Sequence, residues 1–165
     1  MAFAAKEAIF KTFGIGWESG VFRQPHLMVN LLGERFMNEE IMPNTTFTGN
    51  AIARQKNRTG FLIFDEAIKR AMEKRLDDVS NVMRVFDARD FDVLFKAMLD
   101  GGYKDAFIAE SLDELAVKTG IDADGLKATV EQYNSFCEKG YDGQFNKRNP
   151  GAVSIEQFGL IQQRR

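Results

Sequence analysis

The sequence predicts an α+β domain, in which a small mixed or antiparallel sheet with a β-hairpin packs against several helices. Two short and wholly apolar runs, residues 61–64 and 106–109, are typical of strands buried on both faces. Longer segments between and after them place apolar residues on one helical stripe. No repeat or linker interrupts the 165 residues, so we expect a single domain, residues 1–165.

A first helix and the hairpin are expected near the N-terminus. The helix is predicted from three apolar residues at a spacing of four, Ala5, Ile9 and Phe13. The hairpin is predicted as a strand at residues 27–31, a tight turn at Leu32 and Gly33, and a returning strand at residues 34–37. A polar loop, residues 43–49, should then lead into a short helix from residue 50 to about residue 57.

The next helices are predicted from apolar residues at helical spacing. One stripe contains Ile68, Ala71, Met72 and Leu76, and a clearer one contains Phe91, Leu94, Phe95, Met98 and Leu99. Ser111 and Glu114 form a capping box, which predicts a helix that ends at Gly120. Asp122 should cap a last helix that Gly140 ends. The buried face of that helix is predicted to contain Leu126, Val130, Tyr133 and Cys137.

Composition excludes several classes of function. A net charge of -2 gives no general attraction to nucleic acid. With Cys137 and His26 as the single residues of their types, an internal disulfide is impossible and a metal site is not expected. No apolar run approaches the ~20 residues that span a bilayer. We therefore expect no membrane insertion and a cytoplasmic location, although export of a larger parent protein is compatible with the sequence.

The remaining chemistry-bearing residues gather around the predicted hairpin. Arg23 and His26 precede the first strand, where side chains can converge on a cleft; the structural alternative is a solvated arginine and a partly buried histidine. Arg35 and Glu39 can pair and pin the hairpin to the following segment. A glycine cluster at residues 14–20 lacks the preceding strand that a dinucleotide fingerprint needs, so we expect no cofactor site there.

Four motifs in order carry a resemblance to a known family. Residues 27–39 resemble the "VN-x-x-G-x-RF-x-NE" signature of the fumarate reductase/succinate dehydrogenase flavoproteins, and residues 61–65 resemble the "IFD" strand that follows it. Residues 120–134 are similar to the "GID…L…TV…YN" helix of the same domain, and residues 140–145 match its "G-x-D-x-x-F" ending. The resemblance covers about residues 23–148.

The resemblance implies that this chain is the capping domain of an FAD-dependent oxidoreductase, without its flavin-binding domain. In that family the domain closes over the flavin and a small-molecule substrate during hydride transfer to or from an activated carbon–carbon bond. The implied partner is the flavin-binding domain of the same parent, with FAD bound there. We expect neither FAD binding nor activity from this chain by itself, and self-association can occur through the face that the partner would cover.

The sequence departs from the family where a proton-donating arginine is expected. The loop after Asn38 and Glu39 contains no arginine, so no catalytic residue is carried over. The candidates for lining a substrate cleft are Arg23, His26, Asn38, Glu39 and Arg54. An alternative function is a free-standing, non-catalytic binding or interaction module that uses the same fold.

Overall fold

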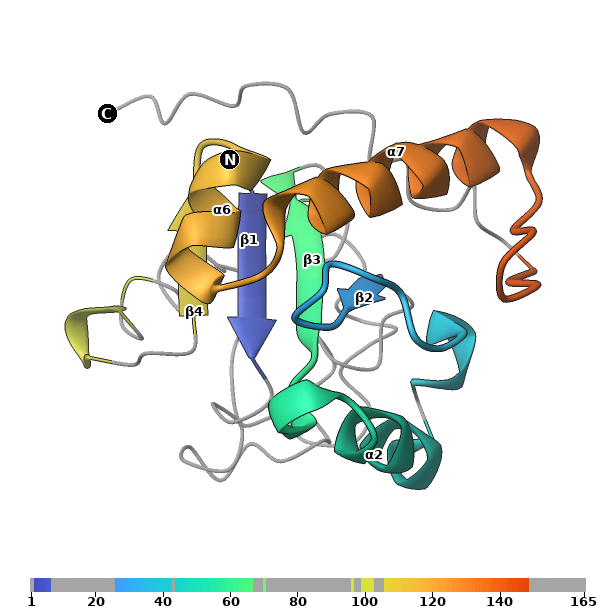
Figure 1. Ribbon diagram of the computed structural model, residues 1–165, viewed down its shortest axis with the longest axis horizontal. Coiled ribbons are helices and arrows are strands. Elements are labelled where there is room, and N and C mark those ends of the chain that lie inside the picture. Colours follow the sequence, from blue (N-terminus) through green and yellow to red (C-terminus); the bar gives the residue numbers. More distant parts are fainter. Residues whose placement is uncertain are drawn as a thin grey trace.

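The sheet of the computed structural model contains four strands in the order β2-β3-β1-β4, and every neighbouring pair is antiparallel (Figure 1). The structure describes residues 2–6, 26–42, 44–66, 70, 96, 99–102 and 106–148. The strands are β1 (Ala2–Lys6), β2 (Leu27–Val29), β3 (Phe61–Asp65) and β4 (Ala106–Ala109). The helices described over their whole length are α2 (Thr45–Ala53), α6 (Leu112–Thr119) and α7 (Ala123–Lys139), with short 3-10 helices η2 (Glu39–Ile41) and η3 (Lys56–Arg58). The predicted α+β class is confirmed.

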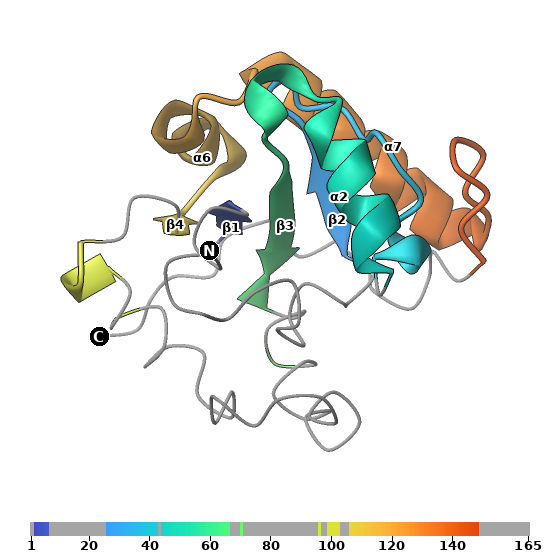
Figure 2. The same ribbon diagram turned by 90° about the horizontal axis from the view of Figure 1, so that it is seen from below.

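The two apolar runs form the strands that the sequence predicts. Strand β3 is buried along its whole length because β2 and β1 flank it and helices pack over it. Helices α6 and α7 lie on one face of the sheet (Figure 2), and α6 packs against β1, β4 and α7. Leu115 of α6 and Leu126, Val130 and Tyr133 of α7 enter the same core as Leu62 to Phe64. This core holds the elements that position the candidate site.

The N-terminal prediction was wrong for the described residues. Ala2–Lys6 is not a helix but a central strand, paired with both β3 and β4. Alanine favours helix, yet two flanking ladders of hydrogen bonds override that preference, as tertiary context often does. The rest of the predicted first helix, the glycine cluster at residues 14–20, the stripe at residues 68–76 and most of the helix at residues 91–99 lie outside the described residues.

Two further predictions are corrected in the middle of the chain. The returning strand of the hairpin is reduced to one bridge, between Val29 and Arg35. Residues 43–49 are not a loop throughout, because α2 already begins at Thr45. The reason is a cap: the side chain of Asn44 accepts a hydrogen bond from the backbone N–H of Phe47 at 3.2 Å.

The last two helices have the predicted ends. Ser111 caps α6 by accepting from the Glu114 N–H, while the Glu114 carboxylate accepts from the N–H of Glu110, one residue before the expected partner. Asp122 caps α7 by accepting from the Gly125 N–H at 2.7 Å. Both helices end at a glycine in the left-handed conformation, Gly120 and Gly140.

Candidate functional site

The turn after β2 is built by the side chain of Asn30. Its Oδ1 accepts from the N–H groups of Leu32 and Glu34, and its Nδ2 donates to Oε1 of Gln55 at 3.1 Å. Gly33 completes the turn with φ +73° and donates its N–H to the Asn30 carbonyl. The asparagine and glycine of the first motif therefore fix the direction in which the chain leaves the sheet.

This turn lies in direct backbone contact with the start of α7. A Cβ added to Gly33 would lie 2.2 Å from the Leu126 nitrogen, and one added to Gly125 would lie 2.0 Å from the Leu32 oxygen. The N–H of Asp122 also donates to the Leu31 carbonyl at 3.0 Å. Only residues without a side chain allow so close an approach, so two separate motifs meet here through their glycines.

Arg35 follows the turn and is the centre of a buried group of charges. Its Nε and Nη2 donate to the two carboxylate oxygens of Glu39 at 2.8 and 2.7 Å. Its Nη2 and Nη1 donate to the two oxygens of Asp142 at 2.7 and 3.1 Å, and Nη1 also donates to Gln144 at 3.4 Å. All five guanidinium hydrogens are thus accounted for within the chain. Arg35 has no donor left with which to hold a substrate.

Lys147 completes what we call the charge cluster, which consists of Arg35, Glu39, Asp142 and Lys147. Its ammonium donates to the Tyr133 hydroxyl and lies 3.6 Å from Oε2 of Glu39. Two cations and two carboxylates balance, which is the condition under which buried charges are tolerated. The rings of Tyr133 and Phe145 also lie 4.9 and 5.0 Å from the Arg35 guanidinium carbon.

Burial and pairing act in opposite directions on the pKa values of Asp142 and Lys147. Burial disfavours the Asp142 carboxylate, but hydrogen bonds from Arg35 and from the N–H groups of Gln144 and Phe145 outweigh it and lower its pKa to about 2. Burial lowers the pKa of Lys147, and the Glu39 charge offsets this in part. Burial and the charge of Glu39 raise the pKa of Tyr133, which stays a neutral hydroxyl.

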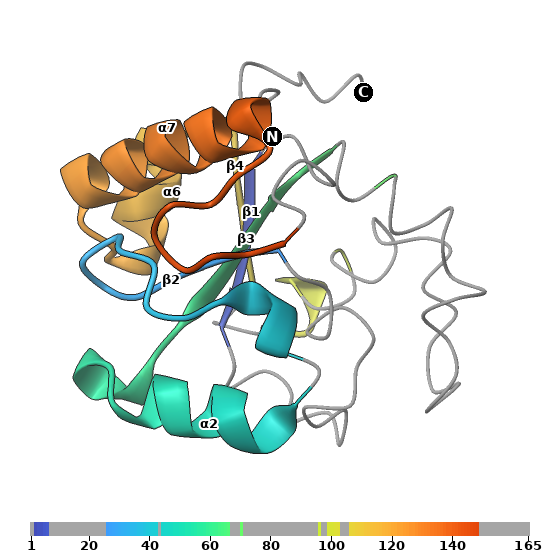
Figure 3. The ribbon, with the colours of Figure 1, turned by 90° about the vertical axis from the view of Figure 1, so that its right-hand side faces the viewer.

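The residues after α7 form a strap, residues 141–148, that runs back between α7 and η2 (Figure 3). Asn38 joins η2 to this strap: its Nδ2 donates to the Phe145 carbonyl at 3.1 Å, while its Oδ1 caps η2 by accepting from the Glu40 N–H. The Glu40 carboxylate accepts from the N–H of Arg148 at 3.1 Å. The structure therefore brings together segments that lie more than one hundred residues apart in the chain.

The predicted cleft residues occupy different places. Asn38 and Glu39 are adjacent to one another and to the strap, with Asn38 half-buried and Glu39 fully buried. His26 is buried directly before β2. Arg54 is exposed at the end of α2 that is distant from η2, separated from it by about 13 Å of helix. Arg23 lies outside the described residues, so the assignment of a shared cleft stays a prediction.

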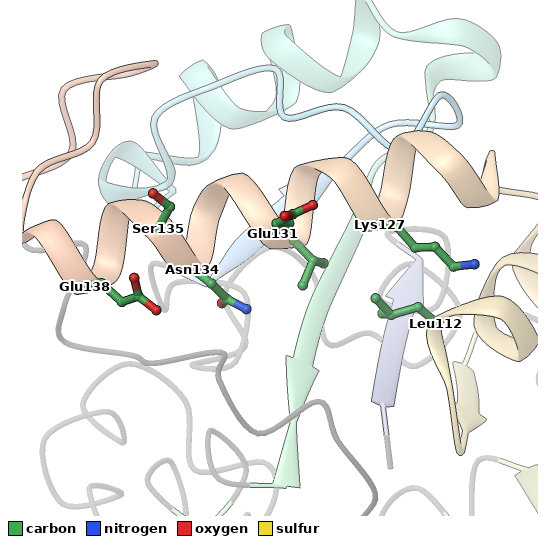
Figure 4. Close-up of a pocket in the computed structure, with 7 residues that line it drawn as sticks. Leu112, Lys127, Glu131, Asn134, Ser135 and Glu138 are labelled. Carbon is green, nitrogen blue, oxygen red and sulfur yellow. The ribbon is translucent and has the colours of Figure 1, made fainter.

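A hollow of about 500 Å³ lies along α7, bordered by Leu112 of α6 (Figure 4). Its other lining residues are Lys127, Val130, Glu131, Asn134, Ser135 and Glu138. Most of these side chains are polar or charged, and they spread along one helix rather than converging on one point. The sequence did not predict this hollow, and its lining lacks the convergent polar groups of a small-molecule site.

Within the described ranges, no group of three or more His, Cys, Asp or Glu side chains could hold a metal ion. Among the same residues, no helix is long and apolar enough to cross a membrane. The best-defined feature of the described chain is thus the segment from the turn to η2, which the charge cluster and the strap hold in place.

The chain is distantly similar to three reductases. It is 27% identical over 154 residues to the vinyl phenol reductase of Lactiplantibacillus plantarum, a match that covers 92% of this chain and 31% of the reductase. It is 32% identical over 125 residues to the urocanate reductase of Eggerthella lenta, covering 74% of this chain and 17% of that protein. A third match, 48% identical over 42 residues, is to the digoxin reductase of E. lenta, covering 26% of this chain and 8% of that protein. No family model matches the chain.

The chain spans less than a third of the length of these curated relatives. The match to the vinyl phenol reductase extends beyond the four motifs, since nearly the whole chain is aligned. The similarity to the vinyl phenol reductase therefore includes most of the residues that the structure describes.

Sequence reasoning missed the partners of the Arg35–Glu39 pair. Asp142 was noticed as a motif residue but not as a ligand of the arginine, and Tyr133 was assigned only to the core. The signal available was that Arg35 and Asp142 both belong to motifs of the same family resemblance, Arg35 to the first and Asp142 to the last. Nothing in a single sequence measures a distance across 107 residues.

Proposed function

We propose that this chain is the substrate-capping part of a longer flavin-dependent oxidoreductase that reduces an activated carbon–carbon double bond. The observation that carries the proposal is the similarity to three reductases, each much longer than the aligned region. Their names state that they reduce vinyl phenol, urocanate and digoxin. By itself the chain would be inactive.

The described residues do not fit the flavin cofactor, which supports the assignment of FAD to the absent part of the protein. A dinucleotide site needs parallel strands followed by a helix whose N-terminal amides face the phosphates. Every strand pairing described here is antiparallel. The N-termini of α2, α6 and α7 are also capped by their own side chains, Asn44, Ser111 and Asp122.

The contribution that these residues can make is a rigid border to a cleft. A capping domain must exclude water and hold groups in fixed positions when it closes. The charge cluster and the Asn38–Phe145 hydrogen bond hold η2 against the strap and α7. Asn38 and Glu39 would thus act by shaping the border of the cleft, since both are already bound within the chain.

The residues after η2 favour a substrate with little charge. A small dicarboxylate needs cations, and arginine suits that task through paired hydrogen bonds. Residues 41–53 contain no charged residue, and Arg54 stands at the far end of α2. An enone or ring ketone fits such a surface better than fumarate does.

The proposal is tested on the longer protein encoded by the reading frame that contains this chain. After purification, bound flavin is measured from its visible absorbance, and double-bond reduction is measured with an artificial electron donor. We expect bound flavin, reduction of enones, and fumarate turnover below about 1 per second. A protein without flavin would contradict the assignment, and rapid fumarate reduction would contradict the substrate class. The 165-residue chain, as the control, should show neither flavin nor activity.

A further inference from the structure

Helix α2 differs from the other described helices because its solvent-facing side carries no charge. None of the residues from Thr45 to Ala53 is charged. Its exposed positions are Thr46, Phe47, Asn50 and Ala53. The exposed positions of α7, by contrast, include Asp124, Lys127, Glu131, Glu138 and Lys139.

The same face presents large apolar side chains to solvent. Phe47 is 60% exposed, although a phenylalanine gains free energy when its ring leaves water. Ile41, at the end of η2, is 41% exposed and lies close to the start of α2, because its carbonyl accepts from the Asn44 N–H at 2.8 Å. Charge depletion together with an exposed aromatic residue is the composition of the central part of an interface.

This surface is also held in a fixed shape. Thr48 and Ile52 bury the opposite side of α2, and the Thr48 hydroxyl donates to the Met42 carbonyl. Asn44 caps the helix at one end, and Gln55 links its other end to Asn30 of the turn. A rigid surface loses little conformational freedom when a partner covers it.

We infer that the outer face of α2, formed by Thr46, Phe47, Asn50 and Ala53 together with Ile41, is the surface on which the rest of the same longer protein docks. The inference rests on the proposed function, because the occupant is the flavin-binding part. The aligned region is less than a third of each relative, so most of such a protein lies outside this chain. An uncharged face suits an intramolecular partner that is always present, since it needs no charge to attract it.

The outer face of one short helix is too small to hold two free copies of the chain together. Interfaces between domains of one chain bury about 600–1,500 Å², and stable dimers usually need a surface larger than one short helix offers. Covalent connection raises the effective concentration of the partner, so a modest apolar patch is sufficient.

The inference is tested by hydroxyl-radical footprinting, which reports the exposure of individual side chains. Phe47 is compared with Tyr141, an aromatic residue that is 61% exposed at the end of α7. The 165-residue chain and the longer protein from its reading frame are oxidised under identical conditions. We expect oxidation of Phe47 to be about fivefold or more slower in the longer protein, with Tyr141 unchanged, because a docked surface excludes water.

Equal oxidation of Phe47 in both proteins would overturn the inference. A reading frame that encodes this chain and nothing more would overturn it as well, because no occupant would exist. Bound flavin and double-bond reduction are measured on the same preparation. If Phe47 is protected but no flavin is bound, the docking surface is supported and the proposed function is rejected. If flavin and activity are present but Phe47 is not protected, the proposed function is supported and the docking surface is rejected.

A pair of variants of the longer protein separates docking from folding. Phe47→Glu places a charge in the surface, whereas Val117→Glu makes the same change at a residue of α6 that is 84% exposed. We expect Phe47→Glu to restore rapid oxidation of Ile41 and to lower double-bond reduction about fivefold or more, with flavin still bound. Val117→Glu should change neither. Equal behaviour of the two variants would contradict the docking surface.

Discussion

The ion pairs around Arg35 and those on the outside of α6 and α7 have similar nitrogen–oxygen distances and very different surroundings. Arg35 and Asp142 are 2.7 Å apart with side chains 1% and 0% exposed. Lys127 and Asp113 are 2.5 Å apart, but their side chains are 47% and 66% exposed. In water the surface pair gives little net free energy, whereas removal of one buried partner leaves an uncompensated charge. Distance alone therefore does not rank these interactions; burial does.

The two groups also differ in what they connect. Lys118–Glu114 lies within α6, and Lys127–Asp113 joins α6 to α7, two helices that already pack against each other. The charge cluster joins the turn, η2, α7 and the strap, and the Asn38–Phe145 and Glu40–Arg148 hydrogen bonds also link η2 to the strap. Loss of the charge cluster should therefore change the position of the strap relative to η2 and α7, as well as lower the free energy of unfolding.

The largest effect is expected from Asp142→Ala. This change leaves two guanidinium donors of buried Arg35 without acceptors and should lower the free energy of unfolding by about 3–5 kcal/mol. Urea unfolding of the 165-residue chain measures it. A loss below about 1 kcal/mol, the range of exposed pairs, would show that water enters the cluster and would break the comparison.

Two glycine variants test the same contrast between a closely packed position and an open one. Gly33 and Gly120 have almost equal φ, +73° and +75°, but a Cβ on Gly33 meets the Leu126 backbone and one on Gly120 meets nothing within 4 Å. Gly120→Ala should cost about 1–2 kcal/mol from backbone strain, and Gly33→Ala should cost roughly 1–3 kcal/mol more from overpacking. Thermal unfolding of both variants gives the difference, and equal costs would show that the turn is not tightly docked on α7.

Acid should weaken the buried group through Asp142. Its pKa is about 2 in the folded chain against 3.8 ordinarily, so the stability it contributes is complete above about pH 4. That contribution is lost progressively as the pH falls from about 4 through about 2. The difference in unfolding free energy between the native chain and Asp142→Asn, followed by urea titration, should shrink over this interval. A difference that stays constant with pH would assign the lowered pKa to another group.

The smallest effect is expected from Asp113→Ala. Loss of the exposed pair with Lys127 should change the free energy of unfolding by less than about 1 kcal/mol, and added salt should remove the difference. A salt-independent loss of several kcal/mol in urea titrations would place this surface pair in the same class as the buried one.

Local signals in the sequence predicted local features of the fold. The strand at residues 106–109, the caps Ser111 and Asp122 and the helix ends Gly120 and Gly140 were all predicted, because each depends on neighbours within a few residues. The start of α2 was missed although Asn44 offered a capping signal. Strand β1 was missed because its state depends on two partners elsewhere in the chain.

In the candidate site, too, contacts between residues near in sequence were predicted and contacts between distant segments were not. The pairing of Arg35 with Glu39 was predicted from the closeness of opposite charges in the sequence and is confirmed; its burial was not predicted. The addition of Asp142 and Lys147 could not be predicted, since it requires the packing of α7 against the turn. The placement of Arg54 away from η2 likewise depends on α2 beginning five residues earlier than the predicted helix.

The central position of β1 has a consequence for how the chain reaches this fold. Its ladder partners are residues 61–65 and 106–109, so the sheet cannot be completed before residue 109 has been synthesised. Pairings between such distant segments are slow to form because long loops must close first. Until then β1 exposes the edge that β4 later covers, and other chains can join an unpaired edge. We therefore expect misassembly during synthesis to begin at this edge of β1.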